Sequence, residues 1–200
     1  VSTSENSTTR LPWRTRALVG AAVAIAAWTA RSRSAASTRR TWNAAPAGFD
    51  STLYSGDHSV KCEVHERLLE AMTPVLTGLL GDYRPLLANF ITKGRGPGGA
   101  MPPHQDWTFV EEAHAFSLNV WIPLVDVDHR NGAMSVLPGG HLMAPTVRGT
   151  DTPNAFCEIE EVAAAQMVEL PMRAVDVLVH DHRLLHATPP NRRRRPRIVA

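Results

Sequence analysis

The sequence is poor in cysteine and has no uncharged run long enough to suggest a membrane span. Its 200 residues include two cysteines, Cys62 and Cys157, and they form no Cys-x-x-Cys motif. A thiolate metal site is therefore not indicated, and we expect both residues to be free, buried thiols. The uncharged run from 17 to 30 is fourteen residues long, whereas a transmembrane helix needs ~20. We expect no membrane contact for the core domain.

Acidic residues are scarce in the N-terminal quarter of the chain. Residues 1–50 hold seven arginines but only Glu5 and Asp50 as acids, and the rest of the chain is mildly acidic although the net charge is +2. This charge balance argues against a nucleic-acid-binding surface on the domain. The Ala/Arg-rich segment resembles a signal or transit segment, with a disordered leader as the alternative. We expect residues 1–50 to be a leader, residues 51–200 to form the domain, and the location to be cytoplasmic.

The pattern after residue 50 predicts one helix followed by short strands. Apolar residues recur at helical spacing from Val60 to Leu80, with Ser59 as the predicted N-cap, Gly81 as the stop and Pro74 as a kink or break. A second, short helix is possible near 158–166. The predicted strands are 86–93, 114–124, 133–137, 167–170, 174–179 and 198–200. Such strands, separated by turns, predict a mostly β domain with flanking helices, of the jelly-roll type.

Two candidate metal ligands lie in the segment Met-Pro-Pro-His-Gln-Asp-Trp at 101–107. On an extended chain successive side chains alternate between faces, so His104 and Asp106 share one face. One imidazole and one carboxylate are two of the three ligands of a 2-His-1-carboxylate triad, which leaves positions open on Fe(II). A His-x-Asp motif is common by chance, so the prediction depends on a third ligand.

His186 is the candidate third ligand. Thr188 lies two residues further on the same predicted face, and the turn at 189–191 can bring Arg197 back beside the strand. A guanidinium near the metal suits a carboxylate co-substrate, because it can donate two parallel hydrogen bonds. His180 and His182 share a face and form a rival pair, which we expect to be structural or to support the site.

These motifs together resemble the phytanoyl-CoA dioxygenase family of Fe(II)/2-oxoglutarate-dependent oxygenases. The resemblance covers residues 84–200 and implies a double-stranded β-helix with the metal inside the barrel mouth. It further implies a C–H hydroxylase of a small organic substrate, with Fe(II) as cofactor and 2-oxoglutarate and O₂ as co-substrates. It assigns Arg197 and Thr188 to the far carboxylate and places two further residues in the co-substrate pocket. The matching motifs are His104-Gln-Asp106-Trp107, Asn119-Val-Trp121, Asn131-Gly132, Pro138-Gly-Gly-His141 and His186-Ala-Thr188, with Asn191 and Arg197; Asn119 and Trp121 are the two pocket residues.

Two other functional classes stay open. A cupin-like barrel could hold a metal-dependent hydrolase or isomerase, in which Arg197 would have no assigned role. A catalytically silent binding protein is the other alternative, because family members usually extend further and we expect this domain to be truncated at its C-terminus. The prime substrate and the oligomeric state are not predicted.

A deletion tests the assignment of the leader. A chain that starts near Gly48 should fold as the full chain does, because residues 1–47 lack the apolar periodicity of the predicted core. Thermal unfolding of both forms measures this. A much lower melting temperature, or an insoluble product, would show that the segment packs on the domain.

Overall fold

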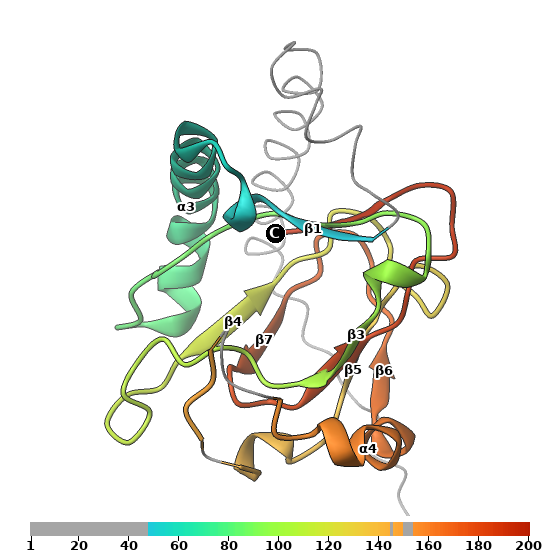
Figure 1. Ribbon diagram of the computed structural model, residues 1–200. Helices are drawn as coiled ribbons and strands as arrows, with labels where there is room; N and C mark the ends of the chain where they lie inside the picture. Colours follow the sequence, from blue (N-terminus) through green and yellow to red (C-terminus); the bar gives the residue numbers. More distant parts are fainter. Residues whose placement is uncertain (1–47, 145, 150–153) are drawn as a thin grey trace, which may run out of the picture.

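Figure 1 shows the computed structural model, which describes residues 48–144, 146–149 and 154–200. Nearly all of the expected leader lies outside the described residues. The helices are α3 (His58–Leu80) and α4 (Glu160–Gln166). The strands are β1 (Phe49–Ser51), β2 (Ile91–Lys93), β3 (Met101–His104), β4 (Leu118–Trp121), β5 (Met134–Val136), β6 (Val168–Leu170), β7 (Leu178–Asp181), β8 (His186–Thr188) and β9 (Arg197–Val199).

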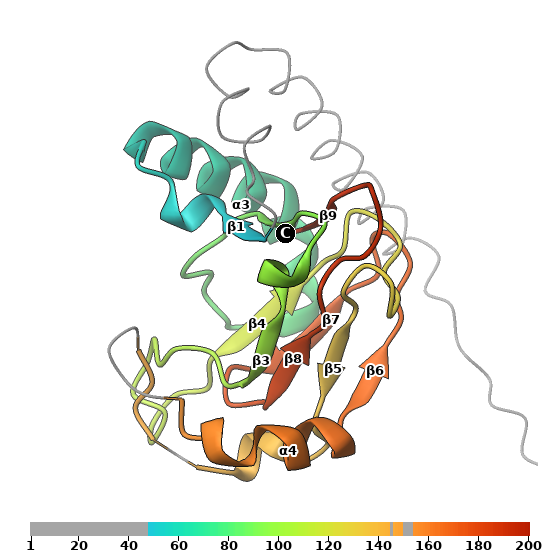
Figure 2. The same ribbon diagram turned by 45° about the vertical axis from the view of Figure 1, so that its right-hand side comes forward.

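The strands form two layers of antiparallel sheet. One layer has the order β3-β8-β5-β6. The other combines β1-β2-β9 with β4-β7, because Ile122 and Leu124, directly after β4, donate backbone hydrogen bonds to the carbonyls of Ala200 and Ile198, each at 2.9 Å. Figure 2 shows the two layers with α4 below them. The predicted class, a mostly β jelly roll with flanking helices, is confirmed.

Helix α3 covers one outer face of the barrel. Its buried side chains Val64, Leu68 and Met72 pack against Phe90, Ile122 and Ile198, which come from the second layer. The helix ends at Gly81, as predicted, with a positive φ of 61°. The predicted N-cap is wrong by two residues, because the Asp57 carboxylate accepts the Ser59 backbone N–H at 2.9 Å. Pro74 lies within a continuous helix.

Several strands are shorter than the apolar runs that predicted them. In the run 86–93 only the last three residues, β2, pair with neighbouring strands. The first four residues of the run line a cavity instead. In the run 114–124 the strand begins at Leu118, since His114 and Ala115 close a turn on Glu111. The run 174–179 becomes β7 only from Leu178, because Val175 has a φ of +68° that no strand residue adopts.

Smaller expectations have mixed outcomes. Both cysteines are free, as predicted, but Cys62 is half-buried and Cys157 exposed. Strand β1 begins at Phe49, two residues before the predicted start of the domain, because it pairs with β2. Among the described residues, no helix combines the length and apolar composition that a membrane span requires.

Candidate metal and co-substrate site

The pairing of β3 with β8 brings the two predicted histidine ligands face to face. His104 and His186 are direct partners across the antiparallel ladder, and their ring centroids lie 4.3 Å apart. Asp106 lies just beyond β3 rather than on it, and its backbone N–H donates to the His182 carbonyl at 2.9 Å. One ligand atom from each of His104, Asp106 and His186 lies within 4.8 Å of the others. The rival histidines His180 and His182 do not join this group.

Backbone carbonyls orient both imidazole rings. His104 Nδ1 lies 2.7 Å from the Pro102 oxygen, and His186 Nδ1 lies 2.9 Å from the Leu184 oxygen. A carbonyl can only accept a hydrogen bond, so Nδ1 carries the proton in each ring. The lone pair of each Nε2 is therefore available to a metal ion, as is usual for metal-bound histidine.

The carboxylate of Asp106 is held in its ionised form. Burial favours its neutral form, but His186, the hydrogen bond from Asn119 and His104 outweigh that effect and lower its pKa. Asn119 Nδ2 donates to Oδ2 at 3.0 Å, while Oδ1 lies 3.8 Å from His186 Nε2. Burial lowers the pKa of His186 to about 4, so its ring is neutral at pH 7. Two imidazoles and one carboxylate suit a divalent cation.

A pair of buried cations lies beside this group. Lys93 and Arg197 are partners across β2 and β9, and Lys93 is fully buried while Arg197 is 1% exposed. Burial and the charge of Arg197 lower the pKa of Lys93 to about 7, and burial lowers that of Arg197 to about 10. Neither side chain forms an ion pair with an acid anywhere in the described part of the chain.

The polar partners of these cations are neutral. Lys93 Nζ donates to Thr188 Oγ1 at 2.6 Å and to the Pro189 carbonyl at 2.8 Å. Arg197 donates through Nη1 to the Gly132 carbonyl at 2.7 Å, and its guanidinium lies 5.5 Å from the centre of the Trp121 ring. Its Nε is buried and has no hydrogen-bond partner among the residues that the structure describes. The predicted residues Thr188, Arg197 and Trp121 line one cavity. Asn119 lines it too, and it also contacts the candidate ligand Asp106.

Lys93 is a residue of this candidate site that the sequence analysis did not predict. It ends an apolar run just before a glycine-rich loop, where a lysine is usually solvated. Its position depends on the pairing of this run with the strand of Arg197, which places the two side chains on one face. Nothing in the sequence showed that pairing.

Gly132 leaves room for the buried lysine. Its φ is +92°, and a Cβ there would lie 2.8 Å from the Pro189 oxygen and 3.1 Å from Lys93 Cδ. The contact with the Pro189 oxygen is too short for an L-residue, the contact with Lys93 is tight enough to displace that side chain, and the positive φ adds strain. The Asn-Gly turn of the sequence therefore shapes the site itself.

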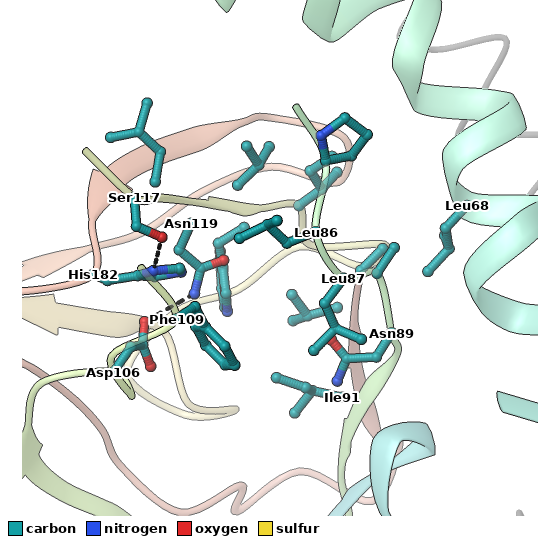
Figure 3. A pocket seen from close by; sticks show the side chains of 18 of the residues that line it. Leu68, Leu86, Leu87, Asn89, Ile91, Asp106, Phe109, Ser117, Asn119 and His182 are labelled. Carbon is teal, nitrogen blue, oxygen red and sulfur yellow. Dashed lines mark hydrogen bonds between the residues drawn. The ribbon is translucent and has the colours of Figure 1, made fainter. Parts of the chain in front are cut away.

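A cavity of about 880 Å³ connects the cluster of His104, Asp106 and His186 with Arg197. His104, Asp106, His186, Thr188 and Arg197 line its inner end, and side chains of α3 and of residues 82–91 line the outer part. Figure 3 shows Leu86, Leu87 and Ile91 across the cavity from Asp106 and His182. The cavity is wide enough for a carboxylate co-substrate and a further small molecule.

Arg148 fastens the segment that follows Asp106. Its Nε donates to the Asp106 carbonyl at 2.6 Å, and its guanidinium pairs with Glu112 at 2.5 Å. The two side chains are 10% and 16% exposed. Thr108 N–H donates to the Arg148 carbonyl at 3.1 Å. Arg148 belongs to the insert between β5 and β6, so these contacts connect that insert to residues 106–112.

Removing Arg148 should destabilise the protein. Arg148→Met leaves the carboxylate of Glu112 buried and unpaired, and we expect a loss of roughly 3 kcal/mol in the free energy of unfolding. The double change Arg148→Met/Glu112→Leu should recover part of that loss. Arg67→Met is the control, because its pair with Glu70 is exposed. Denaturant unfolding measures all four proteins, and an Arg148→Met protein as stable as the parent would contradict the assignment.

Comparisons with known proteins concern the family and the fold of the chain. Residues 55–199 match the phytanoyl-CoA dioxygenase (PhyH) family. A homolog of phytanoyl-CoA dioxygenase domain-containing protein 1 from Dictyostelium discoideum is 27% identical over 122 residues, which cover 56% of this chain and 43% of that protein. The Danio rerio protein of that name is 33% identical over 97 residues, covering 48% of this chain and 30% of its own length. The chain thus spans less than half the length of these relatives.

A solved structure shows the same fold. The epimerase SnoN, in a complex with Fe³⁺, alpha ketoglutarate and nogalamycin RO, superposes with a TM-score of 0.53 at 23% identity. The superposition covers 90% of this chain and 72% of SnoN. At this identity the likeness concerns the fold alone, while the family match extends over most of the chain and confirms the predicted resemblance: the chain belongs to the phytanoyl-CoA dioxygenase family.

Proposed function

We propose that this chain is an Fe(II)/2-oxoglutarate-dependent oxygenase that hydroxylates a C–H bond of a small organic substrate. One observation carries the proposal. Arg197 lies in the wall of the cavity that also contains the His104, Asp106 and His186 cluster, and Lys93 is its buried cross-strand partner. Neither cation has an acidic partner among the described residues. Buried charge is costly unless it is paired, so this arrangement is suited to an anion that arrives from outside the chain.

The metal is held by His104, Asp106 and His186. Their donor set is that of a facial triad, which selects Fe(II) and leaves coordination positions for other ligands. Asn119 orients the carboxylate and the two carbonyls orient the rings. When bound, Fe(II) with O₂ and 2-oxoglutarate supplies the oxidation, in which decarboxylation to succinate and CO₂ accompanies insertion of oxygen into the C–H bond.

The far carboxylate of 2-oxoglutarate is bound by Arg197 and Thr188. Thr188 Oγ1 accepts a hydrogen bond from Lys93, so its own proton is free to be donated to a carboxylate. Arg197 contributes Nε, the buried donor without a partner, while Trp121 and the Gly132 carbonyl fix the guanidinium plane. Lys93 lies behind Thr188 and adds positive charge. The chain's task is thus to bind, to orient and to exclude water.

Metal stoichiometry tests the ligand assignment. His104→Ala, Asp106→Ala and His186→Ala should each lose bound Fe(II), since each removes one donor of three. His180→Ala and His182→Ala should keep it, because their side chains lie outside the cluster. Anaerobic iron analysis of the purified variants decides. If His182→Ala loses iron and His186→Ala keeps it, the third ligand is His182 and not His186.

The guanidinium of Arg197 is expected to dominate co-substrate affinity. Truncating one partner of a buried charge pair costs ~3 kcal/mol, or roughly a hundredfold in affinity. Arg197→Ala should therefore weaken 2-oxoglutarate about that much with iron still bound, and Arg197→Lys should restore only part. The readout is the metal-to-ligand charge-transfer band during anaerobic titration.

Arg194→Ala is the control for that titration, because Arg194 is exposed in the loop before β9. Melting curves of the variants separate a lost contact from a lost fold. If folded, iron-loaded Arg197→Ala binds 2-oxoglutarate as the parent does, the co-substrate assignment fails and a metal-dependent hydrolase becomes the better hypothesis.

Lys93 should make 2-oxoglutarate binding depend on pH. Its pKa is about 7, so the amine is protonated below pH 7. Above pH 7 it must take up a proton when 2-oxoglutarate binds. Affinity should be highest below pH 7 and then fall by up to about tenfold per pH unit. Lys93→Met should bind weakly at pH 6 and lose this dependence, whereas Lys61→Met, changed on α3, should keep it. The same titration repeated from pH 6 to 9 measures the slope, and a flat parent profile would contradict a role for Lys93.

A further inference from the structure

A histidine that is not in the metal cluster lies in the cavity wall beside it. His182 is 8% exposed and lines the cavity next to Asp106. Its Nδ1 is hydrogen-bonded to Ser117 Oγ, and its backbone N–H donates to the Ser117 carbonyl at 3.1 Å. Both residues are buried, so the ring has one fixed orientation (Figure 3). Its Nε2 has no hydrogen-bond partner among the residues that the structure describes.

The surroundings of His182 in the cavity are aromatic. Its ring lies 5.4 Å from that of Phe109, which is 6.4 Å from Trp107, and Trp107 is 6.4 Å from Tyr54. These four rings form one wall, and Phe109 is 46% exposed there. Leu86 and Leu87, 58% and 45% exposed, also line the cavity. Apolar side chains are exposed here because the cavity offers them no protein partner, which is typical of a small-molecule site.

Charged side chains are scarce on this part of the wall. Apart from the metal cluster and Arg197, the acidic and basic residues that line the cavity are Asp82 and Arg84, both exposed. A charged substrate would find no buried partner outside the co-substrate site. This lining favours a substrate that is uncharged and mostly apolar.

We propose that His182 binds an oxygen function of such a substrate through Nε2 and so fixes which C–H bond faces the metal. This inference rests on the proposed function and adds a substrate class to it: an uncharged, largely apolar molecule with a hydroxyl group near its reacting carbon. A hydroxyl group both donates and accepts, so it can pair with either tautomer that the Ser117 contact allows. A substrate lacking that oxygen leaves the half-enclosed imidazole nitrogen unpaired, which is the basis of discrimination.

His182 is a specificity-determining residue in this scheme. A substitution of His182 should leave Asp106 in place, because the Asp106 backbone N–H donates to the backbone carbonyl of His182 and not to its side chain. His182→Leu removes the polar nitrogen but keeps an apolar group, and His182→Gln retains a group that can hydrogen-bond. His114→Leu is the matched control, since His114 is exposed and does not line the cavity.

The experiment compares 1-hydroxypyrene with pyrene, two apolar probes that differ by one hydroxyl group. The anaerobic Fe(II) protein is first saturated with 2-oxoglutarate and checked by its charge-transfer band. Equilibrium dialysis at pH 6.5, with fluorescence detection, then gives both dissociation constants for the parent and the three variants. In the parent, the preference for 1-hydroxypyrene over pyrene should be roughly three- to tenfold greater than in His182→Leu.

The variants separate a polar contact from a packing effect. His182→Gln should keep part of the preference and His114→Leu all of it, while pyrene binds equally to parent and His182→Leu. An unchanged preference in His182→Leu, or equal weakening of both probes, would overturn the role of His182. A parent that binds neither probe would overturn the substrate class. Failure of the proposed function is distinct, because the charge-transfer band would then be absent before any probe is added.

Discussion

The register of β3 against β8 is the constraint on which the site depends. Because His104 and His186 are opposite partners in an antiparallel ladder, their side chains emerge on the same face at the same level. A slip of one residue would turn one ring toward the other face. The order β3-β8-β5-β6 buries β8 between two neighbours, which fixes this register better than an edge strand could.

The cation pair imposes a second constraint, which is energetic. Burying a lysine beside an arginine opposes folding, and the shifted pKa values of Lys93 and Arg197 express that cost. The structure limits it with local dipoles rather than with an acid: carbonyls, the Thr188 hydroxyl and the Trp121 ring. An acid would satisfy the charges but would compete with any incoming carboxylate. The absence of an acid therefore lowers local stability but leaves the cations available to an incoming carboxylate.

The sequence predicted which side chains come together better than it predicted the path of the chain. His104, Asp106 and His186 were identifiable because metal ligation restricts residue type and spacing, and the helix because its apolar stripe is long. Strand ends were predicted poorly where apolar residues such as Leu86 and Phe116 are exposed in the cavity rather than paired. Lys93 was missed because its role follows from the β2–β9 pairing, a contact between residues about a hundred positions apart that leaves no local pattern.

The glycine at 132 has a consequence for judging which relatives are active. Its carbonyl accepts from Arg197, and the space of its missing side chain is taken by Lys93. A homologous chain could therefore keep every metal ligand, and both Thr188 and Arg197, yet fail because a larger residue displaces the lysine behind them. A residue with no reactive group is then as informative about activity in a relative as the candidate metal ligands are.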